Sequence, residues 1–453
     1  MTDAPVPTAS PPAVSPSRRA ALLALALVAA LAACSNKDRP LPGERIPVRP
    51  PEVPAAGAAR AHPLGLPPQT MNADWPRRPG STPARVVNPA FRPVPQLIWA
   101  LDIGAGDTKK RRILAGPIVA GPLVYAIDAG GQLSAATRDG RLAWRVSLVP
   151  EGQLADNGPG GGMTVEGGTL FVGTGFGEVL ALDPATGGVR WRTTVAAPVQ
   201  SAPTLGGGRL LVVSRDDMAY GLDPQSGAVE WQVQGIGGPG LLGGASPASD
   251  GKLAILPFSS GEVQGVLARN GLEVWSTAVT GGRRAFARNS ITDISGAPVL
   301  DGAGTVYASN QSGRTVRLDT ATGERAWTIQ EGSYGPAWPV GGSLFLLSDI
   351  GSLVRADAAT GELIWQVQLP EMFPNPGWFG RGKPYMAVAY YGPVLAGGRL
   401  WVAGADGLLR GFSPADGTQT ASVALPGGAA GQPAVAGGVM YVPTRDGKLL
   451  AFQ

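Results

Sequence analysis

The chain has 453 residues, of which 15% are charged and 67 are glycine, and its formal net charge is +4. So small a charge over this length argues against nucleic-acid binding. Its only histidine is His62 and its only cysteine is Cys34, so the region beyond them has no Ser–His–Asp or Cys–His catalytic set, no usual zinc site and no disulfide of its own.

The first 33 residues have the features of a secretion signal. Two arginines precede the apolar segment 20–31, which is too short to span a bilayer as an ordinary helix. The string Leu31-Ala32-Ala33-Cys34 resembles the bacterial lipobox, in which the cysteine is diacylated and becomes the first mature residue. The alternative is an ordinary signal with an incidental cysteine. We predict a signal peptide over 1–33 and lipidation of Cys34, with Ser35 resembling the pattern that is sorted to the outer membrane.

Residues 34–95 are rich in proline, alanine and arginine and show little apolar periodicity. A segment of this composition buries too little apolar surface to offset the entropy lost on folding. It therefore predicts a disordered, semi-extended tether, followed by a folded domain over 96–453.

Tryptophan recurs through this domain together with the glycines before it. Neighbouring tryptophans are 38 to 52 residues apart, and each has a glycine four residues earlier: Trp144, Trp191, Trp231, Trp275, Trp327 and Trp365. A second glycine stands fourteen residues before five of them, and Asp217 is the exception. A period of about 40–50 residues, with short β-prone runs between Gly, Pro and Asp turns, is typical of β-propeller blades. The predicted fold class is all-β.

The two ends of the repeat region complement each other. The last repeat stops at Gln453 before its tryptophan is reached, whereas the segment 96–101 contains Trp99 but has no meander before it. Pairing this strand with the C-terminal repeat would leave no open sheet edge. We predict an eight-bladed propeller that is closed in this way. In the seventh repeat, Ala421 replaces the tryptophan.

The recurring string ALDPATGGVRW (181–191) resembles the pyrroloquinoline-quinone-type propeller repeat. Two groups carry it. Periplasmic quinoprotein dehydrogenases hold a quinone and calcium on the propeller axis, and the outer-membrane β-barrel assembly factor B (BamB) family consists of eight-bladed lipoproteins without a cofactor. The lipobox, tether, closing tryptophan strand and final repeat resemble the second group over nearly the whole chain. The vicinal cysteine pair of the dehydrogenases cannot exist in a chain with one cysteine.

The resemblance implies a non-catalytic scaffold lipoprotein of the outer-membrane protein assembly machinery (the Bam complex), anchored at the periplasmic face of the outer membrane, without cofactor or metal. Its implied partner is the main assembly protein, bound through that protein's periplasmic POTRA-type repeats. Unfolded outer-membrane proteins are a further candidate partner, and the chain would be a monomer within the complex. The alternative is a quinone-dependent dehydrogenase-like or other cofactor-binding propeller, because this fold hosts many activities.

Three connections between predicted blades are candidate docking loops: 234–246, 280–296 and 370–392. In the family, the first offers leucines and an arginine ahead of a glycine, and the second offers two aspartates. Here Leu242 stands in place of the arginine and Ser295 in place of the second aspartate, while Arg288 would supply charge from the same loop. The resemblance thus implies four partner-binding residues, Leu241, Leu242, Arg288 and Asp293.

Two further expectations concern these loops. The aromatic loop 370–392 is either a docking surface, because aromatics and arginines are enriched at interface hot spots, or an insertion packed on itself. Arg283 is expected to be an exposed loop arginine whose loss leaves stability nearly unchanged.

Overall fold

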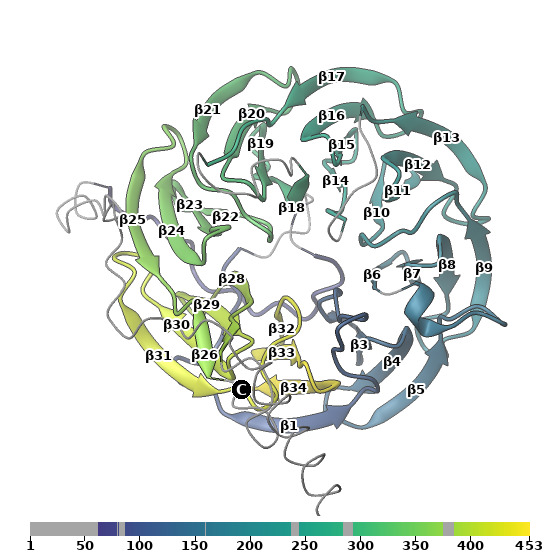
Figure 1. Ribbon diagram of the computed structural model, residues 1–453, viewed down its shortest axis with the longest axis horizontal. Coiled ribbons are helices and arrows are strands. Elements are labelled where there is room, and N and C mark those ends of the chain that lie inside the picture. The colour runs from purple at the N-terminus through teal and green to yellow at the C-terminus, as the bar shows by residue number, and fades with distance from the viewer. Residues whose placement is uncertain are drawn as a thin grey trace, which may run out of the picture. The chain divides into compact units, whose positions relative to one another are not determined.

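The computed structural model describes residues 62–78, 80, 87–158, 160–236, 244–283, 293–374 and 385–453. The chain divides into two compact units, Met1–Glu52 and Val53–Gln453, and every described residue belongs to the second. In this unit eight four-stranded antiparallel sheets stand around one axis (Figure 1). The predicted all-β, eight-bladed propeller is therefore confirmed. No helix in the described part of the chain is long and apolar enough to cross a membrane.

Seven blades are continuous meanders whose strands follow one another from the axis outward (Figure 1). The first three comprise β2 (Ile118–Ala120), β3 (Leu123–Ile127), β4 (Gln132–Thr137) and β5 (Leu142–Ser147); β6 (Gly161–Glu166), β7 (Thr169–Thr174), β8 (Glu178–Leu182) and β9 (Val189–Thr194); and β10 (Thr204–Gly206), β11 (Arg209–Val213), β12 (Met218–Leu222) and β13 (Val229–Gln234). A short 3-10 helix, η1 (Ala155–Asn157), lies between the first two of these blades.

The other continuous blades follow the same order. They comprise β14 (Ala248–Ser249), β15 (Leu253–Pro257), β16 (Glu262–Leu267) and β17 (Glu273–Ala278); β18 (Ile294–Leu300), β19 (Thr305–Asn310), β20 (Thr315–Asp319) and β21 (Arg325–Ile329); β22 (Trp338–Val340), β23 (Ser343–Leu347), β24 (Ser352–Asp357) and β25 (Leu363–Gln368); and β28 (Tyr390–Ala396), β29 (Arg399–Gly404), β30 (Leu408–Phe412) and β31 (Gln419–Ala424). A two-stranded hairpin, β26 (Met372–Pro374) and β27 (Tyr385–Ala387), stands between the last two.

The eighth blade joins the two ends of the domain, as the sequence predicts. Its sheet order is β1-β34-β33-β32, with β1 (Leu97–Asp102) outermost and β32 (Ala434–Ala436), β33 (Val439–Pro443) and β34 (Lys448–Phe452) inside it. Strand β1 runs antiparallel to β34, and Trp99 is opposite Ala451. The closing strand therefore covers the edge of β34 that would otherwise be unpaired.

The recurring tryptophan locks each blade to the next. The indole Nε1 of Trp191 donates a hydrogen bond of 3.0 Å to the carbonyl of Pro224, in the turn between the third and fourth strands of the following blade. Six other tryptophans make the same bond over 2.9–3.3 Å: Trp99, Trp144, Trp231, Trp275, Trp327 and Trp365. The glycine of the receiving turn makes room for the ring, since a Cβ on Gly227 would lie 2.5 Å from Trp191. The repeat pattern thus encodes contacts between blades.

The geometry also explains why the seventh repeat has no tryptophan. Ala421 lies in β31 at the position that Trp231 occupies in β13, because each is opposite the matching glycine of its neighbour strand. The next blade around the ring is the closing one, whose third and fourth strands, β34 and β1, come from opposite ends of the domain. No turn joins them, so that blade offers no receiving turn for an indole from β31.

Two glycines allow the cost of a left-handed backbone to be measured separately from the cost of crowding the tryptophan. Gly323 has a φ of 69°, and a Cβ there would lie 2.5 Å from Trp275, whereas Gly304 has a φ of 87° and open space around it. Gly304→Ala should lower the free energy of unfolding by about 1–2 kcal/mol, the usual cost of a left-handed alanine. Gly323→Ala should cost about 2–5 kcal/mol, because overpacking is added. Urea unfolding of both variants measures the difference. Equal decreases in the free energy of unfolding would contradict the claim that Gly323 makes room for Trp275.

The turns and connections of the ring fall on two faces. Because neighbouring strands are antiparallel, turns between first and second strands (such as 206–208) and between third and fourth strands (such as 223–227) share one face, the turn face. Turns between second and third strands (such as 214–217) and the connections between blades (such as 195–203) share the opposite face, the loop face.

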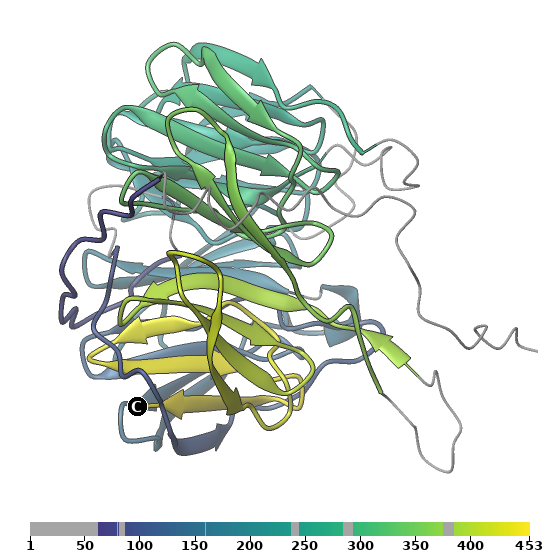
Figure 2. The same ribbon diagram turned by 90° about the vertical axis from the view of Figure 1, so that its left-hand side faces the viewer.

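The described residues from 62 to 91, here called the strap, pack across the turn face (Figure 2). Trp75 exchanges two backbone hydrogen bonds of 2.8 Å with Val119, and Gly437 donates one of 2.7 Å to Asn72. The buried indole of Trp75 stacks on that of Trp338 with ring centroids 6.2 Å apart. Phe91 is also buried and packs edge-on against Trp401. The prediction of a disordered tether as far as residue 95 is wrong for this stretch, because backbone bonds and these aromatic anchors fix it to several blades.

Candidate docking face

The ends of the first two predicted docking loops meet on the loop face. Gly244 and Ala245, at the end of the first loop, line the same small pocket as Asp293 and Ile294, at the end of the second. Asp293 is 8% exposed and stands directly before β18. The other predicted partner-binding residues, Leu241, Leu242 and Arg288, lie outside the described residues, as does Cys34. The structure therefore brings together the described ends of the two loops, and of the four contact residues it describes Asp293.

Asp217 borders this pocket and is a residue whose role the sequence did not reveal. It occupies the position of the recurring glycine and, among the described residues, is the only one other than glycine with a positive φ, 59°. Its carboxylate accepts hydrogen bonds from the amide of Ser259 at 2.9 Å and from the Ser259 hydroxyl at 2.6 Å. A conformation that normally needs glycine is thus kept by an aspartate that reaches the next blade.

Asp217 and Asp293 form an acidic pair. Burial raises the pKa of Asp217, the hydrogen bonds from Ser259 act in the opposite direction, and the negative charges of Asp293 and Asp216 raise the pKa further. The net effect is a pKa above the ordinary aspartate value. Arg215 lines the same pocket as the two carboxylates, so this part of the loop face carries charge of both signs. In the sequence, the only signal of this feature is that Asp217 departs from the glycine pattern.

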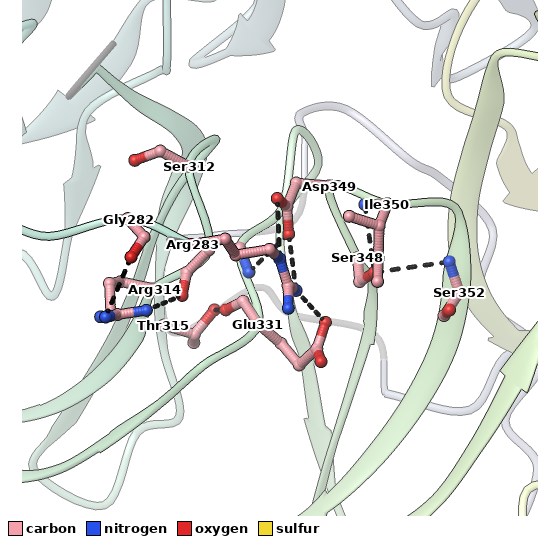
Figure 3. A network of polar contacts seen from close by, with 12 residues as sticks. Gly282, Arg283, Ser312, Arg314, Thr315, Glu331, Ser348, Asp349, Ile350 and Ser352 are labelled. Carbon is pink, nitrogen blue, oxygen red and sulfur yellow. Dashed lines mark hydrogen bonds and ion pairs between the residues drawn. The ribbon is translucent and has the colours of Figure 1, made fainter. Parts of the chain in front are cut away.

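Arg283 lies in a buried ion-pair network rather than on an exposed loop (Figure 3). Its Nη2 contacts Glu331 at 2.5 Å and Asp349 at 3.1 Å, and all three side chains are at most 17% exposed. Asp349 also accepts a 3.0 Å hydrogen bond from the amide of Gly332. The network joins the start of the second docking loop to the connection between β21 and β22, which holds Glu331, and to the turn between β23 and β24, which holds Asp349. The structure therefore contradicts the premise that a place on a loop makes Arg283 unimportant for stability.

The charges of this network are strongly coupled. Burial alone would lower the pKa of Arg283, but its hydrogen bond to Asp349 and the charge of Glu331 outweigh burial and raise it. Burial also raises the pKa of Glu331, which Arg283 offsets only in part. Arg283 is the cation that contacts both carboxylates, so removing it would take this positive charge away from two buried acidic side chains.

A cleft of about 770 Å³ opens on the loop face between the β22–β25 and β28–β31 blades. The hairpin β26–β27 contributes one wall and projects from this face, on the side away from the strap (Figure 2). Three large side chains here are about half exposed: Tyr334 (44%), Met372 (54%) and Tyr385 (50%). Apolar side chains gathered beside a concave surface are typical of protein–protein contact sites.

The base of the aromatic loop is packed on the propeller itself. The hydroxyl of Tyr390 donates a 2.8 Å hydrogen bond to the carbonyl of Pro370, and the guanidinium of Arg410 lies 5.6 Å from the centre of its ring. Burial raises the pKa of Tyr390 and of Tyr391 to about 12. These two tyrosines therefore fit the alternative in which the loop is an insertion packed on the propeller itself. The loop's Trp378, Phe379 and Arg381 lie outside the described residues.

Within the parts of the chain that the structure describes, no group of three or more His, Cys, Asp or Glu side chains could hold a metal ion. Charged groups of the loop face include Asp217 and Asp293 at the pocket and the compensated network around Arg283. Such groups suit recognition of another polypeptide through charge and apolar contact.

Comparisons with known proteins agree in one family. The model of the family described as outer membrane protein assembly factor BamB matches residues 129–367 and 351–453. The proteins with that name from Shigella dysenteriae and Escherichia coli are 36% and 35% identical over 244 residues, which cover 53% of this chain and 62% of each relative. The protein from Xanthomonas campestris is 36% identical over 250 residues, covering 52% of this chain and 59% of its own. The matched region thus spans less than two thirds of these relatives.

Solved structures show the same fold. BamB from Moraxella catarrhalis superposes with a TM-score of 0.63 at 20% identity and covers 80% of this chain and 98% of its own. A quinohemoprotein alcohol dehydrogenase from Comamonas testosteroni has a TM-score of 0.61 at 13% identity, covering 88% and 82%. Identities this low compare the fold alone, and the propeller is common to both groups. The sequence match separates them: the chain belongs to the family of outer membrane protein assembly factor BamB.

Proposed function

We propose that this protein is a non-catalytic scaffold for the assembly of outer-membrane β-barrel proteins. The observation that carries the proposal is the family match, which extends through residues 129–453 and so includes both predicted docking loops. The partner is the main barrel-assembly protein, bound through its periplasmic POTRA-type repeats, and unfolded outer-membrane proteins are a second candidate partner. The protein acts as a monomer within that complex.

Docking takes place on the loop face, and the proposal is supported by the described ends of the loops 234–246 and 280–296, which line one pocket. Leu241 and Leu242 supply the apolar part of the contact, and Arg288 and Asp293 supply charge. Asp217 adds a second carboxylate beside Asp293, which compensates in part for Ser295 in the place of the family's second aspartate. Charge at the edge of an interface mainly steers association, whereas a buried leucine contributes to holding the complex together.

Two leucine-to-aspartate substitutions on the loop face test where the assembly protein docks. Leu241→Asp should weaken binding of the assembly protein by about 30-fold, the equivalent of about 2 kcal/mol for a hot-spot side chain. Leu154→Asp is the control, because Leu154 is 70% exposed on another connection of the loop face; it should bind normally. Surface-immobilised partner titrated with each variant gives the dissociation constants. Undiminished binding by both Leu241→Asp and Asp293→Ala would place docking elsewhere, with the hairpin β26–β27 as the next candidate.

The membrane anchor is the lipid on Cys34. Diacylation supplies the membrane affinity that a chain of net charge +4 lacks. Cys34→Ala should therefore abolish acylation and leave the protein soluble in the periplasm or unprocessed, while Ser35→Ala, a change at the next residue, should still be acylated. Fractionation of cells expressing each variant measures this. Outer-membrane recovery of Cys34→Ala equal to that of the unmodified chain would refute the anchor.

A further inference from the structure

The hairpin β26–β27 is a small sheet of two strands that projects from the loop face (Figure 2). Among the described residues, neither strand pairs with a third one. Its base is fixed to the propeller by the 2.8 Å hydrogen bond between the Tyr390 hydroxyl and the carbonyl of Pro370. The two strands are joined at this base, where the amide of Val388 donates to the carbonyl of Glu371 at 2.9 Å. Because two strands alone are marginally stable in water, a third strand would stabilise the hairpin.

The register of the hairpin identifies the backbone groups on its outer edges. Val388 and Glu371 are a hydrogen-bonded pair. In an antiparallel ladder such pairs alternate with pairs whose backbone groups point outward, and on β27 the outward positions are Tyr385 and Ala387. On β26 they include Pro374, which has no amide proton. Strand β27 therefore offers the better edge for an added strand. It has neither a charged residue nor a proline, which commonly protect an exposed edge.

The side chains of the hairpin are apolar or aromatic on both faces. Opposite residues of an antiparallel pair share a face, so Met372, Tyr385 and Ala387 lie on one face. Phe373 and Met386 lie on the other. Met372 and Tyr385 are 54% and 50% exposed, and Met372 and Ala387 line the cleft of about 770 Å³. A strand added to β27 would thus extend an apolar face that borders this cleft.

The cleft itself offers apolar contact and little uncompensated charge. Its larger side chains are mainly apolar or aromatic: Tyr334, Leu347, Ile350, Met372, Val388 and Tyr391. None of the residues that line it is basic. The two acidic ones are Asp349, whose charge is compensated by Arg283, and Glu371. Such a surface selects a partner by shape and apolar contact, and it suits an extended chain better than a highly charged one.

An extended segment with alternating apolar and polar side chains fits both features. Its backbone would pair with β27, and its apolar side chains, two residues apart, would share the face that borders the cleft. The strands of outer-membrane barrels have this alternation, with aromatic residues near their ends. We propose that the β27 edge and the cleft bind extended segments of unfolded outer-membrane β-barrel proteins by strand addition. This inference rests on the proposed function, because it specifies where the second candidate partner binds.

Peptide binding, measured by fluorescence anisotropy on the full-length protein, tests strand addition. The labelled probe has about ten residues, the length of a membrane strand, in which Val, Phe and Tyr alternate with Thr, Ser and Gln. Two further peptides are N-methylated, one at every apolar residue and the other at every polar residue. An added strand turns the amides of one set toward β27, so one methylated peptide should bind about 10-fold more weakly and the other should bind normally. Equal binding by both methylated peptides would overturn the proposal.

A matched pair of variants at one position tests the edge of β27. Ala387→Pro removes an outward amide and leaves the bonds to β26 in place. It should weaken binding of the alternating peptide about 5-fold, the effect of one lost hydrogen bond. Ala387→Ser keeps the amide and should bind as the unmodified protein does. Equal binding by the two variants, or no binding by the unmodified protein, would contradict strand addition at this edge.

Capture of the main assembly protein separates this inference from the proposed function. Ala387→Pro should capture it normally, because the loops 234–246 and 280–296 belong to other blade connections. Loss of capture in this variant would overturn the inference, since the hairpin would then serve the assembly protein. Peptide binding that is sensitive to Ala387→Pro, in a protein that captures no assembly protein, would support the strand site and contradict the proposed docking.

Discussion

Deletion of residues 94–101 should destabilise the propeller by at least about 3 kcal/mol, the lower end of the usual cost of losing a packed tryptophan, because Trp99 is partly buried. Trp99 donates a 2.9 Å hydrogen bond to the carbonyl of Arg138 and packs against Tyr441 with ring centroids 5.8 Å apart. The deletion also removes the pairing of β1 with β34 and exposes the edge of β34 as a template for another chain. We therefore expect a lower urea midpoint and concentration-dependent oligomers in size-exclusion chromatography.

A deletion of equal length provides the control. Removing residues 42–49 shortens the predicted tether by the same number of residues, and it should change neither the urea midpoint nor the elution volume. A 94–101 deletion variant that is as stable and as monomeric as this control would show that the ring does not depend on its closing strand.

Arg283→Ala should lower the free energy of unfolding by about 3–5 kcal/mol, because it leaves Glu331 and Asp349 buried without their cation. The loss should depend on pH. A carboxyl whose folded pKa is raised, as that of Glu331 is by burial, binds protons more tightly in the folded state, so it favours folding at low pH and loses that contribution as pH rises through the folded pKa. Without Arg283 this effect grows, and the deficit should be larger at pH 7.5 than at pH 5.

Two further variants isolate the buried charge. Glu331→Gln added to Arg283→Ala should recover part of the lost stability, because one of the two uncompensated carboxylates is gone. Arg141→Ala, which breaks an exposed pair with Asp139, should cost less than about 1 kcal/mol. Urea unfolding at several pH values measures all three. An Arg283→Ala deficit that is as small as that of Arg141→Ala and constant with pH would mean that the network is not buried in solution.

The ring could be predicted from the sequence because each blade repeats the same contact with the next. The tryptophan of one blade and the turn glycine of the next blade are the two sides of one contact, so their regular spacing in the sequence indicates that contact directly. Even the exception is informative, since Ala421 faces the one blade that has no turn between its outer strands. The closing strand could be predicted for the same reason, because Trp99 makes the same contact with the turn of the next blade.

The strap could not be predicted, because it occurs once and has no period. Its composition resembles that of a disordered linker, and its attachment depends on backbone bonds to distant strands and on single aromatic anchors such as Trp75. The ion-pair network of Arg283 could not be predicted for a related reason. The counter-charges of Arg283 lie 48 and 66 residues further along the chain, in the connection before β22 and in the turn between β23 and β24. A single sequence gives no sign that such residues meet.

We propose that this chain binds the barrel-assembly protein and carries out no chemistry of its own. Affinity capture of the full-length protein from detergent-solubilised outer membranes, followed by mass spectrometry, tests this proposal most directly. We predict that the main barrel-assembly protein is recovered in near-stoichiometric amount and that the captured protein oxidises no alcohol or sugar after addition of pyrroloquinoline quinone and calcium. Capture that lacks the assembly protein, together with dye-linked oxidation that is lost on chelation, would contradict the scaffold account in favour of a dehydrogenase.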